Sequence, residues 1–186
     1  MRVIAGSARG TKLVAPRGMD TRPTADRVRE ALFSIIQSRY ELDGTHVMDI
    51  CAGTGGLGIE ALSRGASSCC FIENNREALK CLKQNLHATH CTARATVLEM
   101  DLLKALPLLA ARGRCFSIIF FDPPYASELY TTVLDMLSTL ELLCPGGLFI
   151  AESAIRNVLP EKMGNFIKAD RRMYGDTALE MYILGE

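Results

Sequence analysis

Short apolar runs alternate with amphipathic segments along most of the chain. The apolar runs predict strands at 46–50, 69–73, 95–99, 116–121 and 147–152. Apolar residues at three- and four-residue spacing predict helices at 57–64, 76–88 and 127–142, and a weaker helical segment at 102–111 that Pro107 interrupts. This alternation predicts parallel βαβ units in an α/β fold, with helices on both faces of the sheet and ligands beyond the carboxyl ends of the strands.

The two ends of the chain depart from this alternation. Near the C-terminus, apolar segments flank Gly175-Asp176, which predicts an antiparallel hairpin at the sheet edge. The first 18 residues predict a short β-hairpin, and Thr24 is expected to cap a helix whose apolar face packs on the body. We therefore expect an N-terminal arm, residues 1–23, and one domain, residues 24–186.

Charge is distributed unevenly although the formal net charge is zero. Residues 1–29 hold seven basic and two acidic side chains, a net charge of +5, which leaves 14 basic and 19 acidic side chains for the rest. A basic arm on an acidic body suits contact with nucleic-acid phosphates, and a solvated basic hairpin without a ligand is the alternative. The residues that we expect to contact RNA are Arg2, Arg9, Lys12, Arg17, Arg22 and Arg27.

Length and cysteine content narrow the class of protein. The 186 residues suffice for one domain with its own core, and no apolar run reaches the about 18 residues that a membrane span needs, so we expect a cytoplasmic protein. The seven cysteines are an odd number without a CxxC pair, and most lie in apolar surroundings. We expect them to pack as small reduced hydrophobes, with no metal site and no structural disulfide.

A glycine-rich loop follows the first expected strand. Asp49 ends that strand, and Ala52 precedes the pattern Gly53-x-Gly55-x-x-Gly58, which runs into the next helix. Glycines at these positions let the backbone approach a cofactor closely and make the turn from strand to helix. The pattern also matches the dinucleotide fingerprint, so the loop alone favours neither a nicotinamide enzyme nor a methyltransferase.

Acidic residues follow the next two strands at the same edge of the sheet. Glu73 lies 20 residues after Gly53, where its carboxylate could accept hydrogen bonds from ribose hydroxyls. Asp101 could accept a hydrogen bond from an adenine amino group. Each acid could instead cap the helix that follows it. With Asp49, these residues would surround a ligand that carries adenosine.

The fourth expected strand leads into Asp122-Pro123-Pro124-Tyr125 at this edge. The prolines restrain the backbone and lack N–H groups, so a carboxylate and a peptide carbonyl are presented side by side. If they accept both hydrogens of an exocyclic amine, they favour the pyramidal nitrogen that attacks an electrophile, and they stabilise the charge that develops there. Tyr125 could stack on a base. The catalytic residues that we predict are Asp122, Pro123 and Tyr125; a rigid turn is the alternative.

These motifs together resemble a known family. Asp122-Pro-Pro-Tyr125 with the glycine loop resembles class I methyltransferases that act on exocyclic or amide nitrogens. The segments beginning at Arg2 and Glu60, and above all Arg22-Pro-Thr-Ala-Asp-Arg-Val-Arg-Glu-Ala-Leu-Phe33, resemble the RsmD-type bacterial 16S rRNA guanine-N2 methyltransferases over nearly the whole chain.

The resemblance implies a Rossmann-like fold, with a seven-stranded, mostly parallel sheet and a reversed last strand. It implies S-adenosylmethionine as cofactor, guanine 966 of 16S rRNA as target and a 30S assembly particle or free rRNA as partner of a monomeric enzyme. The cofactor-binding residues would be Asp49, Ala52, Gly53, Gly55, Glu73, Asp101 and Asp122. Cys51 replaces an expected aromatic residue and Gly56 an expected Ala or Ser, which affects the fit under the adenosine.

Other activities fit parts of the same pattern. A methyltransferase for adenine N6 in DNA or for a protein glutamine shares the four-residue motif, but the chain has no room for a separate DNA-recognition domain, and the basic arm disfavours a peptide partner. A nicotinamide oxidoreductase would leave residues 122–125 without a task. A non-catalytic RNA-binding module would not need the cofactor loop.

Overall fold

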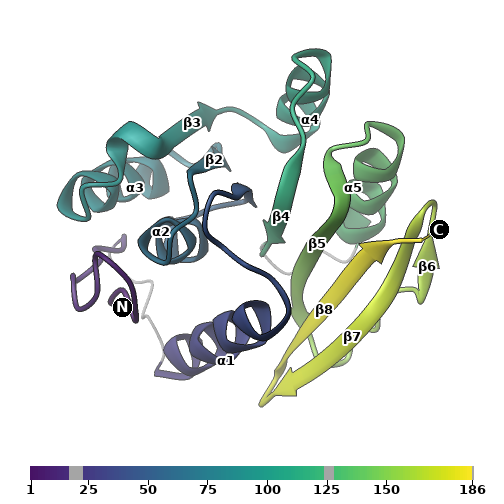
Figure 1. Ribbon diagram of the computed structural model, residues 1–186, viewed down its shortest axis with the longest axis horizontal. Helices are drawn as coiled ribbons and strands as arrows, with labels where there is room; N and C mark the ends of the chain where they lie inside the picture. The colour runs from purple at the N-terminus through teal and green to yellow at the C-terminus, as the bar shows by residue number, and fades with distance from the viewer. Residues whose placement is uncertain (17–22, 124–127, 186) are drawn as a thin grey trace.

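The structure, a computed structural model, describes residues 1–16, 23–123 and 128–185 (Figure 1). One sheet contains all the named strands of these residues. The strands are β1 (His46–Ile50), β2 (Ser68–Glu73), β3 (Ala95–Glu99), β4 (Phe116–Phe121), β5 (Leu143–Ala154), β6 (Lys162–Met163), β7 (Phe166–Tyr174) and β8 (Thr177–Leu184). The helices are α1 (Pro23–Arg39), α2 (Gly56–Ser63), α3 (Arg76–Ala88), α4 (Leu102–Ala111) and α5 (Glu128–Thr139), with a 3-10 turn at Thr92–Arg94.

The sheet order is β3-β2-β1-β4-β5-β8-β7-β6. The first five strands in this order are parallel, and β8 runs antiparallel to both of its neighbours, β5 and β7. The expected α/β methyltransferase fold, with a mostly parallel sheet and a reversed last strand, is confirmed. The described sheet has eight strands instead of seven because the two-residue β6 adds one antiparallel pair at the edge.

Helices cover both faces of the sheet (Figure 1). Strand alternation divides the apolar side chains between two cores. One core joins α1, α2 and α3 to residues such as Val47 and Phe120. The other joins α4 and α5 to residues such as Met48 and Phe121. Because the central strands are buried on both faces, they consist of nearly continuous apolar residues, which is why their positions were predictable.

Two details of the predicted helices are wrong. Helix α1 begins at Pro23, so Thr24 is its second residue and not the N-cap. The fixed φ of proline suits the first position of a helix, where the missing N–H costs no hydrogen bond. Helix α4 continues through Pro107, where we expected an interruption, since Leu106 and Leu109 on either side of the proline are both held in the core.

The N-terminal arm forms a minimal hairpin fastened to α2. An antiparallel bridge pairs Arg2 with Lys12, and the Val3 N–H donates to the carbonyl of Thr11 at 3.0 Å. Within its described residues the arm pairs with none of the named strands of the sheet; instead, the Glu60 carboxylate on α2 accepts the N–H groups of Ile4 and Ala5 at 2.8 and 3.0 Å. Two backbone N–H groups of the arm are therefore satisfied by one buried side chain.

Glu60 is also the centre of a buried charge cluster. It is 1% exposed and lies 2.7 Å from Nε of Arg64 and 3.7 Å from Nε of Arg29. Arg29 in turn donates to the carbonyl of Arg2 at 2.6 Å. The two guanidinium groups and the two backbone N–H donors compensate for the desolvation that burial imposes on the Glu60 carboxylate.

Further contacts hold the hairpin turn against the same helix. The Ser63 hydroxyl donates to the carbonyl of Ala5 and accepts the N–H of Ala8, while its carbonyl accepts the N–H of Ser7 at 2.8 Å. Gly6 has a φ of +82°, and a Cβ there would lie 1.8 Å from the Ser63 carbonyl oxygen. Only glycine permits this approach of the arm to α2.

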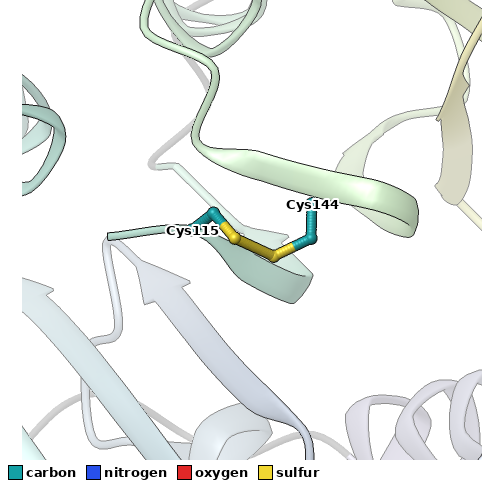
Figure 2. Close-up of a disulfide and its surroundings, with 2 residues drawn as sticks. All are labelled: Cys115 and Cys144. Carbon is teal, nitrogen blue, oxygen red and sulfur yellow. A yellow bond between two sulfur atoms is a disulfide. The ribbon is translucent and has the colours of Figure 1, made fainter. Parts of the chain in front are cut away.

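The expectation of no structural disulfide is wrong. Cys115 and Cys144 form one, with Cα atoms 5.4 Å apart (Figure 2). Cys115 directly precedes β4, Cys144 is the second residue of β5, and Phe116 pairs with Leu143 across the two strands. Strand pairing thus joins cysteines that are separated by 29 positions, which their number and spacing in the sequence did not indicate. The remaining five cysteines are free.

Replacing Glu60 with alanine is expected to lower the free energy of unfolding by about 3–5 kcal/mol, because two guanidinium groups would lose their buried partner. Chemical denaturation would measure this change. The matched control is Glu77→Ala, which removes an exposed carboxylate paired with Lys80 at 2.7 Å and should change stability by about 0.5 kcal/mol or less. Equal effects of the two substitutions would contradict a central role for Glu60.

Candidate functional site

The predicted site residues gather at the carboxyl edge of the parallel strands. Ile50 of β1 lies between Ile72 of β2 and Phe121 of β4, and Phe121 pairs with Ala151 of β5. The residues that come next on these four strands are therefore level with one another. They are Glu73, Cys51, Asp122 and Glu152, in spatial order across the sheet.

The glycine loop between β1 and α2 uses its three patterned glycines differently. Gly53 has a φ of +56°, and a Cβ there would meet nothing within 4 Å, so this position faces open space. Gly55 has a φ of +83° and is the N-cap of α2, where a Cβ would lie 2.4 Å from Leu82. At Gly58 a Cβ would lie 2.3 Å from Phe71. Gly53 is thus available to a ligand, while Gly55 and Gly58 serve close packing.

Asp49 and Ala52 hold this loop in place by hydrogen bonds to α2 and β2. Asp49 is 2% exposed, and its carboxylate accepts the N–H of Gly58 at 2.8 Å. The Ala52 N–H donates to the carbonyl of Ile72 at 3.0 Å, which continues the backbone contact between the two strands beyond β1. Asp49 therefore fixes the start of α2.

Glu73 joins the end of β2 to the glycine loop. Its carboxylate accepts the Gly53 N–H at 2.8 Å and the N–H groups of Asn74 and Asn75 at 2.8 and 2.7 Å. The N-cap of α3 is Asn75, whose side chain accepts from Glu77 and Ala78. Glu73 is therefore not the helix cap, and three N–H donors leave part of its acceptor capacity for a ligand.

Asp101 caps the helix that follows it, which was the alternative to a role in ligand binding. It is the N-cap of α4, and its side chain accepts the N–H of Leu103 at 2.9 Å. One oxygen of an exposed carboxylate is occupied in this way, and the carboxylate retains acceptor capacity. Its role toward a ligand stays a prediction.

Asp122 and Pro123 follow β4 directly, with Asp122 exposed and Pro123 buried. Tyr125 lies outside the described residues. Asp122 belongs to a carboxylate group that includes Glu152 as well as the residues of the glycine-loop side. Asp122 thus lies between Cys51 of the glycine-loop side and Glu152 of β5, and the action of Asp122 and Pro123 as an acceptor pair stays a prediction.

The electrostatics of the site are those of crowded carboxyl groups. Loss of hydration raises the pKa of Asp49 to about 7; the Gly58 N–H opposes this rise, and the charges of Asp122 and Glu73 add to it. Loss of hydration also raises the pKa of Asp122 to about 6. For Glu152 the same effect and the charge of Asp122 raise the pKa to about 8. Such a group of acids favours a positively charged ligand.

Cys51 stands among these acids with a φ of +60°. Burial raises the pKa of its thiol to about 12, and the charges of Glu73, Asp49, Asp122 and Asp101 add to the rise. A thiol with this pKa stays protonated at neutral pH, so Cys51 offers a small neutral contact and not a nucleophile. Among the described residues, no group of three His, Cys, Asp or Glu side chains could hold a metal ion.

The basic residues of the arm are mostly at the surface. Arg2, Arg9 and Lys12 are exposed, as is Arg27 on α1. Arg17 and Arg22 lie outside the described residues. Arg29, which contributes to the positive charge of the first 29 residues, is 5% exposed and is committed to the Glu60 cluster. No helix within the described ranges is long and apolar enough to cross a membrane.

Asn85 is a residue whose role the sequence analysis missed. It is 1% exposed, and its side-chain amide exchanges two hydrogen bonds with the backbone of Val14, at 2.8 and 3.0 Å. It also donates to the carbonyl of Thr54 in the glycine loop at 2.9 Å. The signal was an amide on the apolar face of α3, one turn beyond Leu82. Asn85 therefore connects the arm to the loop.

Glu152 was also missed. An acid at the end of the fifth strand carries the same signal as Glu73 at the end of the second, but only the strand order places it next to Asp122. Glu60 gave a comparable signal, since it is a charged residue within the otherwise apolar stretch of α2.

Comparison with known proteins shows which family the chain matches. Residues 1–183 match the family described as "Conserved hypothetical protein 95". The chain is 38% identical over 182 residues to the Bacillus subtilis protein named "Putative rRNA methyltransferase YlbH", with 98% of each chain covered. It is 34% identical over 182 residues to Ribosomal RNA small subunit methyltransferase D of Escherichia coli, covering 98% of this chain and 89% of that protein.

Solved structures share the whole architecture. A hypothetical protein of Thermus thermophilus superposes with a TM-score of 0.85 at 31% identity, covering 99% of each chain. A methyltransferase-like protein of Escherichia coli, yhhF, superposes with a TM-score of 0.84 at 34% identity, covering 100% of this chain and 98% of that one. The sheet, its reversed strand and the arm therefore have counterparts over their full length.

Proposed function

Because this chain belongs to the Conserved hypothetical protein 95 family, that of the RsmD-type methyltransferases, we propose that it transfers a methyl group from S-adenosylmethionine to guanine N2 in small-subunit rRNA. The proposed target is guanine 966 of 16S rRNA. The observation that carries the proposal is the position of Asp122 and Pro123 beside the glycine loop, within a row of carboxylates. The enzyme would act as a cytoplasmic monomer on free rRNA or on a 30S assembly particle.

The residues present fit S-adenosylmethionine. Gly53 turns an open backbone position toward the site, and the Glu73 carboxylate next to it retains acceptor capacity for ribose hydroxyls. The surrounding acids favour the positive sulfonium and ammonium groups of this cofactor, whereas they would repel the phosphates of a nicotinamide dinucleotide. Charge thus favours the methyltransferase over the oxidoreductase that the glycine pattern also allows. When bound, the cofactor supplies the electrophilic methyl group.

Asp122 and Pro123 supply acceptors for the amine. Loss of hydration raises the pKa of Asp122 to about 6, which leaves its carboxylate mostly ionised at neutral pH. The carboxylate and the Pro123 carbonyl would accept the two N2 hydrogens and stabilise positive charge as it develops on nitrogen. The product nitrogen is acidic until it loses a proton, and Asp122 or water can take that proton. Tyr125 would stack on the base.

The arm would hold the RNA. Arg2, Arg9, Lys12 and Arg27 are exposed, and Arg17 and Arg22 belong to the same basic segment. We propose that residues 1–23 contact RNA phosphates while residues 24–186 form the methyltransferase domain. A methyltransferase for adenine N6 in DNA or for a protein glutamine shares the amine chemistry, but these 186 residues leave no room for a separate DNA-recognition domain, and the basic arm disfavours a peptide partner.

One labelling experiment tests the function as a whole. The protein is incubated with labelled S-adenosylmethionine and, in separate reactions, with naked rRNA, 30S particles, DNA and protein, and the labelled position is then mapped. We expect label on a guanine of small-subunit rRNA. Label only in DNA or protein would reject the RNA substrate. In a separate thermal-shift assay, S-adenosylmethionine should raise the melting temperature of the protein, whereas a nicotinamide dinucleotide should not.

Glu73→Ala is expected to weaken S-adenosylmethionine binding by roughly 1.5–3 kcal/mol, as for hydrogen bonds to a charged group. Calorimetry would measure the affinity. Glu99→Ala is the matched control, because Glu99 pairs with Glu73 across β2 and β3 but is exposed and bound to Lys83. Unchanged affinity in the Glu73 variant would mean that the carboxylate only organises the loop.

Replacing Arg9, Lys12 and Arg17 with alanine is expected to weaken RNA binding while cofactor affinity is retained. The slope of log K against the logarithm of the salt concentration should become shallower by up to about 2–3. Binding would be titrated at several salt concentrations. A control with the same change in net charge replaces Arg112, Arg114 and Lys162, which are exposed on other elements. Equal salt slopes in both triple variants would contradict a specific role of the arm.

Asp122→Ala is expected to lower kcat by about 10²–10³-fold, comparable with the loss of one oxyanion-hole donor, because Asp122 would act mainly in the transition state. Affinity for RNA should change much less. Asp122→Asn should retain more activity, since its amide carbonyl still accepts a hydrogen bond. Single-turnover kinetics at saturating cofactor would measure the rates, and a full-rate alanine variant would exclude the proposed role.

A further inference from the structure

Glu152 is an acid of the site that the mechanism above does not use. It lies on β5 at the position level with Asp122, on the side opposite to Glu73 and the glycine loop. Its backbone is held firmly: Leu179 of β8 pairs with it, and the Tyr130 hydroxyl of α5 donates to its carbonyl at 2.7 Å. The side chain is half-buried. The fold therefore presents a second carboxyl group beside Asp122, on the side away from the cofactor.

The surroundings of Glu152 differ from those of the structural acids in this protein. Buried Glu60 pairs with two arginines, and buried Glu180 pairs with Lys168 and Arg171. Within the described ranges no lysine or arginine forms an ion pair with Glu152. The charged group that acts on its pKa is Asp122, which is also negative. A desolvated acid next to a like charge destabilises the fold, so this placement indicates a ligand contact.

We propose that Glu152 is a specificity-determining residue, whose carboxylate accepts a hydrogen bond from N1–H of the guanine while Asp122 and Pro123 hold its N2 amine. The inference rests on the proposed function and adds the group that identifies the base. In guanine the N1–H donor adjoins the C2 amine, so an acceptor beside Asp122 meets it on the same edge of the ring. Glu152 occupies that neighbouring position, one strand away from Asp122.

This contact would reject bases that lack the N1 hydrogen. An ionised carboxylate only accepts hydrogen bonds, and the unprotonated N1 of adenine or of 2,6-diaminopurine is also an acceptor. The two lone pairs would face each other without a proton between them. In the free protein, loss of hydration and the charge of Asp122 raise the pKa of Glu152 to about 8, so the two bases are compared above this pH, where the carboxylate is ionised before either base binds. A donor at N1 favours the ionised form and so lowers this pKa when guanine binds.

The test compares two RNA substrates whose target base differs along one edge, at N1 and at the substituent on C6. The target guanine is replaced by 2,6-diaminopurine, which keeps the C2 amine but has no hydrogen on N1, in the RNA form that the labelling experiment identifies. For the unmodified enzyme we expect kcat/KM to be about 10- to 100-fold higher with guanine. Glu152→Ala should reduce this preference to about 1, and Glu152→Gln should keep part of the rate with guanine, because its amide can still accept.

Controls distinguish a failure of the proposed function from a failure of the Glu152 contact. Glu161→Ala, an exposed acid beyond β5, should keep the full preference for guanine. If the unmodified enzyme methylates no guanine RNA, the proposed function itself fails. If it methylates guanine but shows no preference over 2,6-diaminopurine, or if both Glu152 variants keep that preference, the role of Glu152 is overturned. Because the readout is a ratio of two substrates for one enzyme, a general loss of stability cannot imitate the expected result.

Discussion

The lateral register of the parallel strands is the constraint on which the rest of this structure depends. Ile50, Ile72, Phe121 and Ala151 pair across four strands, so the residues that follow them lie level with one another at this edge of the parallel strands. Parallel connections return behind the sheet, and the residues at the carboxyl edge are therefore free to carry chemistry. Here they are mostly acids, whose mutual repulsion and poor hydration make a cationic ligand and an N–H-bearing substrate favourable partners.

A second set of contacts relates the arm to that edge. Glu60 and Ser63 fasten the hairpin to α2, and Asn85 bonds both Val14 of the arm and the Thr54 carbonyl of the glycine loop. The arm has too few residues for a core of its own: it buries Val3, Ala8 and Leu13 in the core that contains α1, α2 and α3, and its backbone bonds to polar side chains of α2 and α3. Because α2 starts at the glycine loop, the proposed RNA-binding element and the glycine loop are both joined to this helix.

Much of the fold and part of the site could be predicted from local patterns. The buried central strands are nearly continuous apolar runs, so periodicity located them within one or two residues, and β5 alone extends well beyond its predicted ends. Glu73 and Asp122 were found because each ends a strand, and parallel strands end at one edge. The capping alternative holds for one oxygen of Asp101, since an acid before a helix looks the same in sequence whether it binds a ligand or an N–H.

The sequence by itself determined what depends on neighbours along the chain: strands, helices, the glycine turn and the place of residues 122–123 after the fourth strand. Tertiary structure decided what depends on strand order. It joined Cys115 to Cys144, buried Arg29 and Glu60 together, and placed Glu152 beside Asp122. The physical reason is that β1 lies between β2 and β4, and β4 between β1 and β5, so contacts across the sheet combine segments whose separation in sequence carries no local signal.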